Sequence, residues 1–184
     1  MKRLGLALVA VALCFAAARP AMAQAVGSLR WGVNAGVLLP MGTYGDGDKM
    51  GFVGGLGATY WLPAGSIGVR GDLSYAQTSH DGGISGNTKI IGGMASLVYA
   101  LNPASAPARV MITGGVGMYN VKVDVGGTSG SETKIGFGGG AAVAFKMGTG
   151  STRLVLGSRF TSVSTSGSSI TFLPITVGLS FGKK

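Results

Sequence analysis

Few residues in this sequence have the chemistry of a catalytic or metal-binding site. Cys14 is the only cysteine and His80 the only histidine, so a zinc site, which needs several such ligands, has too few candidates. Ser79 adjoins His80, but neighbours in a strand point to opposite sides and do not form a nucleophile–base pair. The glycine runs at 54–57 and 114–117 lack the G-x-G-x-x-G spacing and the following helix of a dinucleotide site. We therefore expect a protein that is not an enzyme and that holds no metal or cofactor.

Charged residues form a second candidate set, because they alternate with apolar residues along the chain. This period places charges on one face of a strand and apolar side chains on the other. If the charged faces enclose a lumen, two interpretations stay open: a polar plug in which Asp72 pairs with one or two arginines, or a narrow anion-preferring pore for small solutes. The set comprises Arg30, Arg70, Asp72, Lys134, Lys146, Arg153 and Arg159.

The composition predicts that the elements carrying these charges are strands in a membrane. Glycine accounts for 35 of 184 residues, without the G-X-Y period of collagen, and it alternates with branched and aromatic residues that a disordered linker would lack. Mean hydropathy is +0.44, yet beyond the N-terminus no apolar stretch reaches the ~18 residues of a membrane helix. A chain that is apolar overall and polar at every second residue has the composition of a membrane β-barrel.

Residues 1–23 have the features of a cleaved secretory signal peptide. An apolar stretch follows two basic residues and ends in the A-x-A cleavage sequence Ala21-Met22-Ala23. Cleavage there leaves residues 24–184 as a single barrel domain without cysteine. The remaining 12 basic residues outnumber six acids but are spread singly, so we expect no nucleic-acid binding.

Beyond the signal peptide, eight segments alternate apolar with small or polar residues in the two-residue period of a strand. Each reaches the ~9–11 residues that a tilted strand needs to cross a membrane. The sequence therefore predicts an all-β, eight-stranded antiparallel up-and-down transmembrane β-barrel with its apolar parity facing lipid. In the fourth segment the inner parity contains Ile90 and Val98 as well as Met94 and Ser96, so the alternation is weaker there. The predicted strands are 29–39, 51–62, 66–77, 89–101, 109–121, 134–146, 152–162 and 170–181.

The connections between these segments alternate in length. Those at 63–65, 102–108 and 147–151 are generally shorter than those at 40–50, 78–88, 122–133 and 163–169. An even strand count places both chain ends on the periplasmic side, so the longer set is expected to form the outer loops. His80, beside Asp81, falls in one of these loops, and we expect its side chain to be solvated.

Aromatic residues of outward parity gather toward the predicted strand ends. Aromatic rings at the level of the lipid headgroups are typical of membrane barrels. The expected girdle contains Trp31, Tyr60, Tyr99, Phe145 and Phe181 at the periplasmic end, and Tyr75 at the opposite end.

The last predicted strand resembles the C-terminal strand of outer-membrane barrels. It alternates apolar residues and closes on an aromatic, with the outward positions Leu173, Ile175, Val177, Leu179 and Phe181. The chain after the signal peptide resembles, mostly as a pattern, the outer membrane protein β-barrel domain family, which includes OmpX and the transmembrane domain of OmpA. In that family the aromatic is usually the last residue, whereas residues 182–184 follow it here. Pro174 is expected near the strand start, where a missing N–H is tolerated.

This resemblance implies a location in the cell outer membrane, contact with its lipid and lipopolysaccharide, and recognition of the last strand by the barrel-assembly machinery. We expect a monomeric, non-enzymatic barrel with a structural or surface-interaction role. Two alternatives remain: the anion-preferring pore, and a soluble lipocalin-like calyx whose apolar parity faces inward around a hydrophobic ligand. Conductance distinguishes the pore, and extraction without detergent would indicate the calyx.

Overall fold

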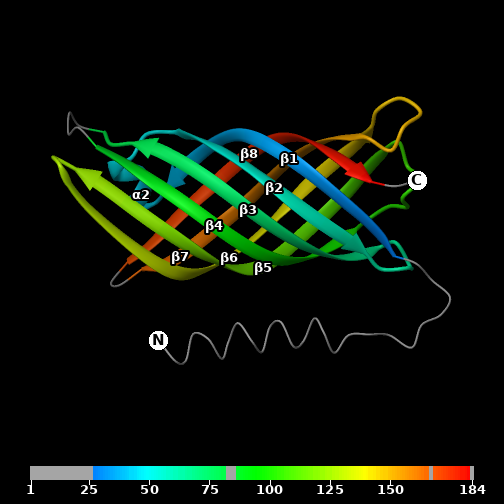
Figure 1. Ribbon diagram of the computed structural model, residues 1–184, viewed down its shortest axis with the longest axis horizontal. Helices are drawn as coiled ribbons and strands as arrows, with labels where there is room; N and C mark the ends of the chain where they lie inside the picture. The colour runs from blue at the N-terminus through cyan, green and yellow to red at the C-terminus, as the bar shows by residue number, and fades with distance from the viewer. Residues whose placement is uncertain (1–26, 82–85, 166–167, 183–184) are drawn as a thin grey trace.

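The computed structural model describes residues 27–81, 86–165 and 168–182, which form a closed antiparallel barrel (Figure 1). Each strand pairs with its neighbours in sequence, and β8 pairs back to β1. The predicted fold is thereby confirmed, while the expected signal peptide lies outside the described residues. The strands are β1 (Ser28–Met41), β2 (Gly51–Trp61), β3 (Ile67–Ser79), β4 (Gly86–Ala100), β5 (Ala108–Val125), β6 (Thr128–Lys146), β7 (Arg153–Thr165) and β8 (Ser168–Gly182).

One short helix, α2 (Thr43–Gly47), follows β1 and was not expected from the sequence. It lies at the end of the barrel where β1 finishes and β8 begins, here called the loop end (Figure 1). The opposite end, where β1 begins and β8 finishes, is called the terminal end. In the described part of the chain, no helix combines the length and apolar character needed to cross a membrane.

The sequence alternation corresponds to the two faces of the barrel wall. On β4, Ile91 and Leu97 are 58% and 65% exposed on the outer face. Ile90 and Val98, the apolar residues of inner parity, are 3% and 5% exposed in the lumen. The apolar parity therefore faces outward, which is the reverse of the arrangement that a calyx for a hydrophobic ligand requires.

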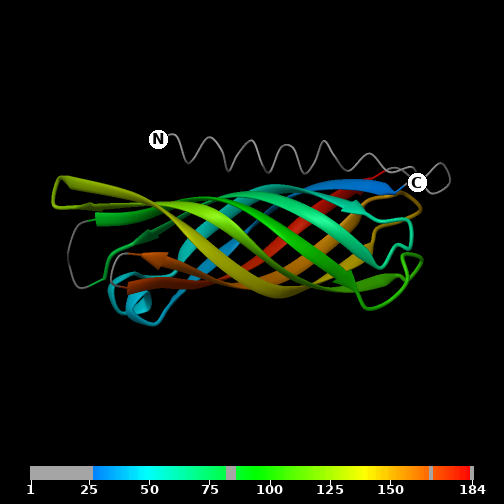
Figure 2. The same ribbon diagram turned by 90° about the horizontal axis from the view of Figure 1, so that it is seen from below.

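The strands reach further at the loop end than the sequence predicts. The ladder between β5 and β6 continues to Val125 and Thr128, so most of the expected loop at 122–133 is strand. Gly126 and Gly127 close the hairpin with φ of 56° and 86°, the left-handed values that a two-residue turn of this kind requires. This hairpin projects beyond the other described strands (Figures 1 and 2).

Pro174 lies inside β8 and not near its start as expected, because the strand begins at Ser168. Proline has no N–H to donate to a ladder. On the β7 side the ladder skips Arg159 and Phe160, whereas on the β1 side Pro174 stays opposite Leu38. The barrel accommodates the proline through a local interruption of the hydrogen-bond ladder between β7 and β8.

Inner glycines provide the space that a large lumen side chain occupies. A Cβ added at Gly92 would lie 2.4 Å from Tyr119 Cδ1, and one at Gly136 would lie 2.9 Å from the same ring. Gly93, which follows Gly92 but points outward, has Leu73 Cδ2 at 3.4 Å from the corresponding position. Glycine is therefore required on the inner face of β4, where the ring approaches closely.

Gly92→Ala should lower the free energy of unfolding by about 1–3 kcal/mol, the usual penalty for overpacking. The new methyl group displaces the Tyr119 ring from its place against the wall. Urea unfolding in lipid vesicles measures the difference, with Gly93→Ala as the matched control that should stay near wild type. Equal losses in the two variants would contradict this account of the inner face.

Candidate functional site

The middle of the lumen holds an ion-paired group that connects opposite walls of the barrel. Asp72 on β3 accepts hydrogen bonds from Arg70 Nε at Oδ1 (2.8 Å) and Oδ2 (3.0 Å), and its Oδ1 forms an ion pair with Arg70 Nη2 at 2.7 Å. Arg159 on β7 donates from Nη2 to Asp72 Oδ2 at 3.1 Å. Since three strands separate β3 from β7 in either direction around the barrel, this contact crosses the lumen. Asp72 is therefore shared by two arginines, an arrangement that compensates buried charge.

A cavity of about 170 Å³ adjoins the ion-paired group and is lined by all three of its side chains. Arg159 Nη1 also contacts Met94 Sδ at 3.2 Å, and the Tyr119 hydroxyl donates to the same sulfur at 3.5 Å. One water needs roughly 10–15 Å³ of such volume, so the cavity has room for several. The middle layer thus combines ion pairing with space for hydration.

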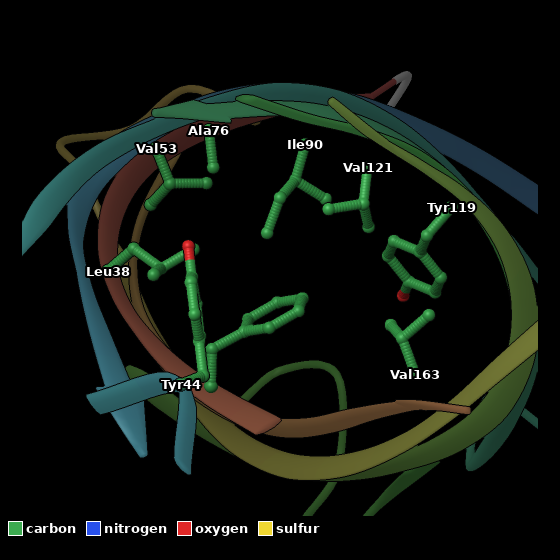
Figure 3. Packing of buried hydrophobic residues seen from close by; sticks show 9 residues of the cluster. Leu38, Tyr44, Val53, Ala76, Ile90, Tyr119, Val121 and Val163 are labelled. Carbon is green, nitrogen blue, oxygen red and sulfur yellow. The ribbon is translucent and has the colours of Figure 1, made fainter. Parts of the chain in front are cut away.

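Toward the loop end, mostly apolar side chains fill the lumen. Figure 3 shows them pointing inward from the wall and from α2. Leu38 and Val163 are both 0% exposed. A hydrated ion would find few polar partners across this layer, and such apolar constrictions exclude water from pores. The layer consists of Leu38, Tyr44, Val53, Ala76, Ile90, Tyr119, Val121, Val163 and Phe172.

A chain of hydrogen bonds holds Tyr44 of α2 in this apolar layer. The Tyr44 hydroxyl lies 2.8 Å from Thr78 Oγ1, which donates to Asp48 Oδ1 at 2.6 Å. Asp48 Oδ2 in turn lies 3.2 Å from His80 Nδ1. Because Thr78 uses its proton toward Asp48, Tyr44 donates to Thr78. Burial raises the pKa of the Tyr44 hydroxyl to about 12, so it remains a donor at physiological pH.

The expectation of a solvated His80 is wrong. Its side chain is 11% exposed, and an isolated β-bridge joins Asp48 to His80. The segment after α2 folds back against the end of β3, which the sequence pattern does not indicate. Among residues 27–81, 86–165 and 168–182, no group of three or more His, Cys, Asp or Glu side chains is placed to hold a metal ion.

Three inward arginines reach the short turns at the terminal end. Arg109 on β5 donates to the carbonyl of Gly65 in the β2–β3 turn. Arg30 on β1 donates to the carbonyl of Ser151 in the β6–β7 turn. Arg153 on β7 donates to two carbonyls of the β4–β5 turn, at 2.7 and 3.4 Å. Each guanidinium group donates hydrogen bonds to carbonyls of a turn that is distant in the sequence. The three arginines together therefore hold the three turns against the barrel wall.

Sequence reasoning missed Arg109. It is 5% exposed, and its guanidinium lies over the Trp61 ring at 3.8 Å from the centroid. Such stacking is a common use of arginine beside an aromatic face. Its inner parity in the predicted strand 109–121 is the signal that would have identified it.

The seven charges predicted for the lumen do not form one cluster. Arg70, Asp72 and Arg159 lie in the middle, and Arg30 and Arg153 lie at the terminal end. Lys134 lies toward the loop end with its Nζ 2.7 Å from Glu132 Oε1, so this cation has an acid of its own. Lys146 is exposed at the terminal end, opposite Arg153 in the register. Parity predicts the face of a residue but not its depth in the barrel.

The predicted aromatic residues lie on the outer face. Trp31 and Phe181 pack together at the terminal end with ring centroids 4.7 Å apart. Tyr75 packs on Phe52 toward the loop end, at 5.9 Å. Tyr60, Tyr99 and Phe145 are 45%, 48% and 40% exposed near the terminal ends of their strands. On β8, the outward positions are Leu173, Ile175, Val177, Leu179 and Phe181.

Asp72→Asn should lower the free energy of unfolding by about 3 kcal/mol, because it leaves Arg70 and Arg159 in the lumen without a compensating charge. Urea unfolding in lipid vesicles measures the loss. Asp124→Asn is the matched control, since Asp124 pairs with Lys89 and Lys122 at 3.4 Å on more exposed side chains and should contribute less than about 1 kcal/mol. If Asp72→Asn were no more destabilising than the control, the ion-paired group would not support the fold.

Comparisons with known proteins agree with this architecture. Residues 7–181 match the family described as outer membrane protein beta-barrel domain. A comparison with curated protein sequences gives no match. Among solved structures, Neisserial surface protein A is 17% identical with a TM-score of 0.66, covering 83% of this chain and 96% of its own.

Two further structures show the same fold. A major outer membrane protein from Thermus thermophilus is 17% identical, with a TM-score of 0.62 and coverage of 84% of this chain and 99% of its own. The Yersinia pestis outer membrane protein Ail in a phospholipid bilayer nanodisc is 21% identical, with a TM-score of 0.50 and coverage of 84% and 99%. Since the family match spans nearly the whole sequence, the chain belongs to the outer membrane protein beta-barrel domain family and is a transmembrane β-barrel of the cell outer membrane.

Proposed function

We propose that the protein is a non-enzymatic barrel that presents its loop end for contacts at the cell surface. The projecting β5–β6 hairpin carries this proposal. Residues 128–131 of β6 pair with β5 on one side, whereas, among the residues that the structure describes, the ladder between β6 and β7 begins at Gly136. An exposed strand edge offers backbone N–H and C=O groups to a strand of another chain.

The side chains of the hairpin suit an accessible contact surface. Val123 and Val125 are 36% and 42% exposed, and hydroxyl-bearing residues follow the turn. Because β1 begins and β8 finishes at the terminal end, and an even-stranded outer-membrane barrel has both of these ends in the periplasm, the loop end is assigned to the extracellular side. The partner would be a protein that adds a strand to this edge.

The arrangement of the lumen favours this contact role over the anion-preferring pore. Asp72 compensates two of the inward arginines, and the apolar layer lies between this middle layer and the loop end. An eight-stranded barrel is only wide enough for its own side chains. The cations of the lumen then serve the fold and not the passage of anions.

The outer face supports two proposals about the membrane. The exposed aromatic residues at the terminal end, with Tyr75 toward the loop end, form a girdle at the lipid headgroups. Lys89 and Lys122, near Asp124 on the outer face, would meet the phosphates of outer-leaflet lipid or lipopolysaccharide.

Two further proposals concern assembly and oligomeric state. The barrel-assembly machinery would recognise the outward side chains of β8, and the barrel would act as a monomer.

Trimming the hairpin tests the contact role. A variant in which residues 123–130 are replaced by Asn-Gly retains the opposed pair Lys122 and Ser131 and closes the hairpin near the barrel. It should fold, shown by the mobility difference between boiled and unboiled samples. Cells with the wild-type barrel should adhere to protein-coated surfaces more strongly than cells without the barrel. Cells that display the trimmed variant should lose this additional adhesion. Unchanged adhesion, or none in the wild type, would refute the proposal.

Planar-bilayer recordings test whether the lumen conducts. The wild-type barrel should give no reproducible single-channel steps, because the apolar layer provides no polar path for ions. A general porin inserted in the same bilayers verifies that channels are detected. Reproducible steps with anion selectivity would instead support the pore.

A further inference from the structure

The charges of the barrel are distributed unequally along its axis. All six acids lie in the described residues. Asp72 is in the middle, and the remainder lie toward the loop end, where they nearly balance Lys49, Lys89, Lys122 and Lys134. The acids at the loop end are Asp46, Asp48, Asp81, Asp124 and Glu132. No acid lies at the terminal end, although Arg30, Arg109, Lys146 and Arg153 do.

The terminal arginine cluster, defined as Arg30, Arg109 and Arg153, is compact. Arg30 donates to Ser180, which lies opposite Arg153 in the register, and Arg153 donates to the carbonyl of Ala144, which lies opposite Arg109. Each of the three side chains extends from a different strand to a different turn. Their hydrogen bonds to the turn carbonyls hold all three guanidinium groups in place at the mouth of the barrel. Lys146 lies beside the cluster at the rim, opposite Arg153 in the register.

The contacts of the cluster leave donors for a ligand. Arg109 is buried, yet its Nε has no hydrogen-bond partner among the described residues. The hydrogen bonds of Arg30 and Arg153 are made to neutral oxygens, at Ser180, at the carbonyl of Ala144 in β6 and in the turns. A guanidinium has five N–H donors in a fork that matches a carboxylate or a phosphate. Like charges held this close are relieved by an oxyanion between them.

We propose that the terminal arginine cluster binds an oxyanion, a carboxylate or a phosphate group, presented from the periplasm. The cluster has inner parity, while the neighbouring outward positions are apolar residues such as Trp31 and Leu154. A ligand therefore enters through the barrel mouth and not from the surrounding lipid. Arg30 and Trp61 both line the central cavity, and the Arg109 guanidinium lies over the Trp61 ring, so the cluster adjoins the terminal side of this cavity.

The test uses the folded barrel in phosphatidylcholine nanodiscs, titrated with inorganic phosphate or with citrate. The NMR signals of the arginine Nε–H groups should shift saturably for Arg30, Arg109 and Arg153. Arg153→Gln should weaken binding about tenfold, the loss expected when one charged hydrogen-bond partner is removed. Lys122→Gln, which removes a loop-end cation, should leave the affinity unchanged.

Further arms keep the proposal open to refutation. If Arg153→Gln does not fold, Lys146→Gln should still weaken binding a few-fold, because it removes an exposed charge beside the cluster. Nanodiscs containing phosphatidylglycerol should not shift these signals without added anion. Shifts that do not saturate, equal weakening by Lys122→Gln, or shifts produced only by phosphatidylglycerol would overturn the proposal.

Discussion

The contact on which the lumen depends is the sharing of Asp72 between Arg70 and Arg159. A barrel of eight strands encloses too little space for bulk water, so its inward charges must be compensated by its own side chains or by a few enclosed waters. Asp72 does this for two arginines from opposite walls. Arg159 and the Tyr119 hydroxyl both contact the sulfur of Met94. The ion-paired group therefore also helps to position the Tyr119 ring, which lies against Gly92 and Gly136.

On either side of the ion-paired group, the lumen is filled by side chains of different chemistry. Toward the loop end the lumen is filled with apolar side chains, including Tyr44 from α2, and needs no counter-charge. Toward the terminal end it is filled with arginines whose hydrogen bonds are made mainly to carbonyls of the short turns. The first arrangement closes the lumen toward the loop end. The second leaves an excess of positive charge at the terminal end, which the proposed orientation places in the periplasm.

The sequence predicted which face of the barrel wall each residue occupies better than it predicted the position of the residue along the barrel axis. Alternation identified eight strands and placed even the apolar Ile90 and Val98 in the lumen, because the period of a strand is local. Which inward residues meet depends on register and strand tilt, and so Lys134, which pairs with Glu132 toward the loop end, was grouped with the charges of the middle and of the terminal end. The burial of His80 depends on a contact with Asp48 across a loop, which no local pattern encodes.

The interruption at Pro174 has a mechanical consequence. Between β7 and β8 the ladder lacks two backbone pairs where Arg159 and Phe160 pass Pro174. Arg159 is also the residue that reaches across to Asp72. The ion pair between Arg159 and Asp72 thereby connects this interrupted stretch of the wall to the opposite side of the barrel.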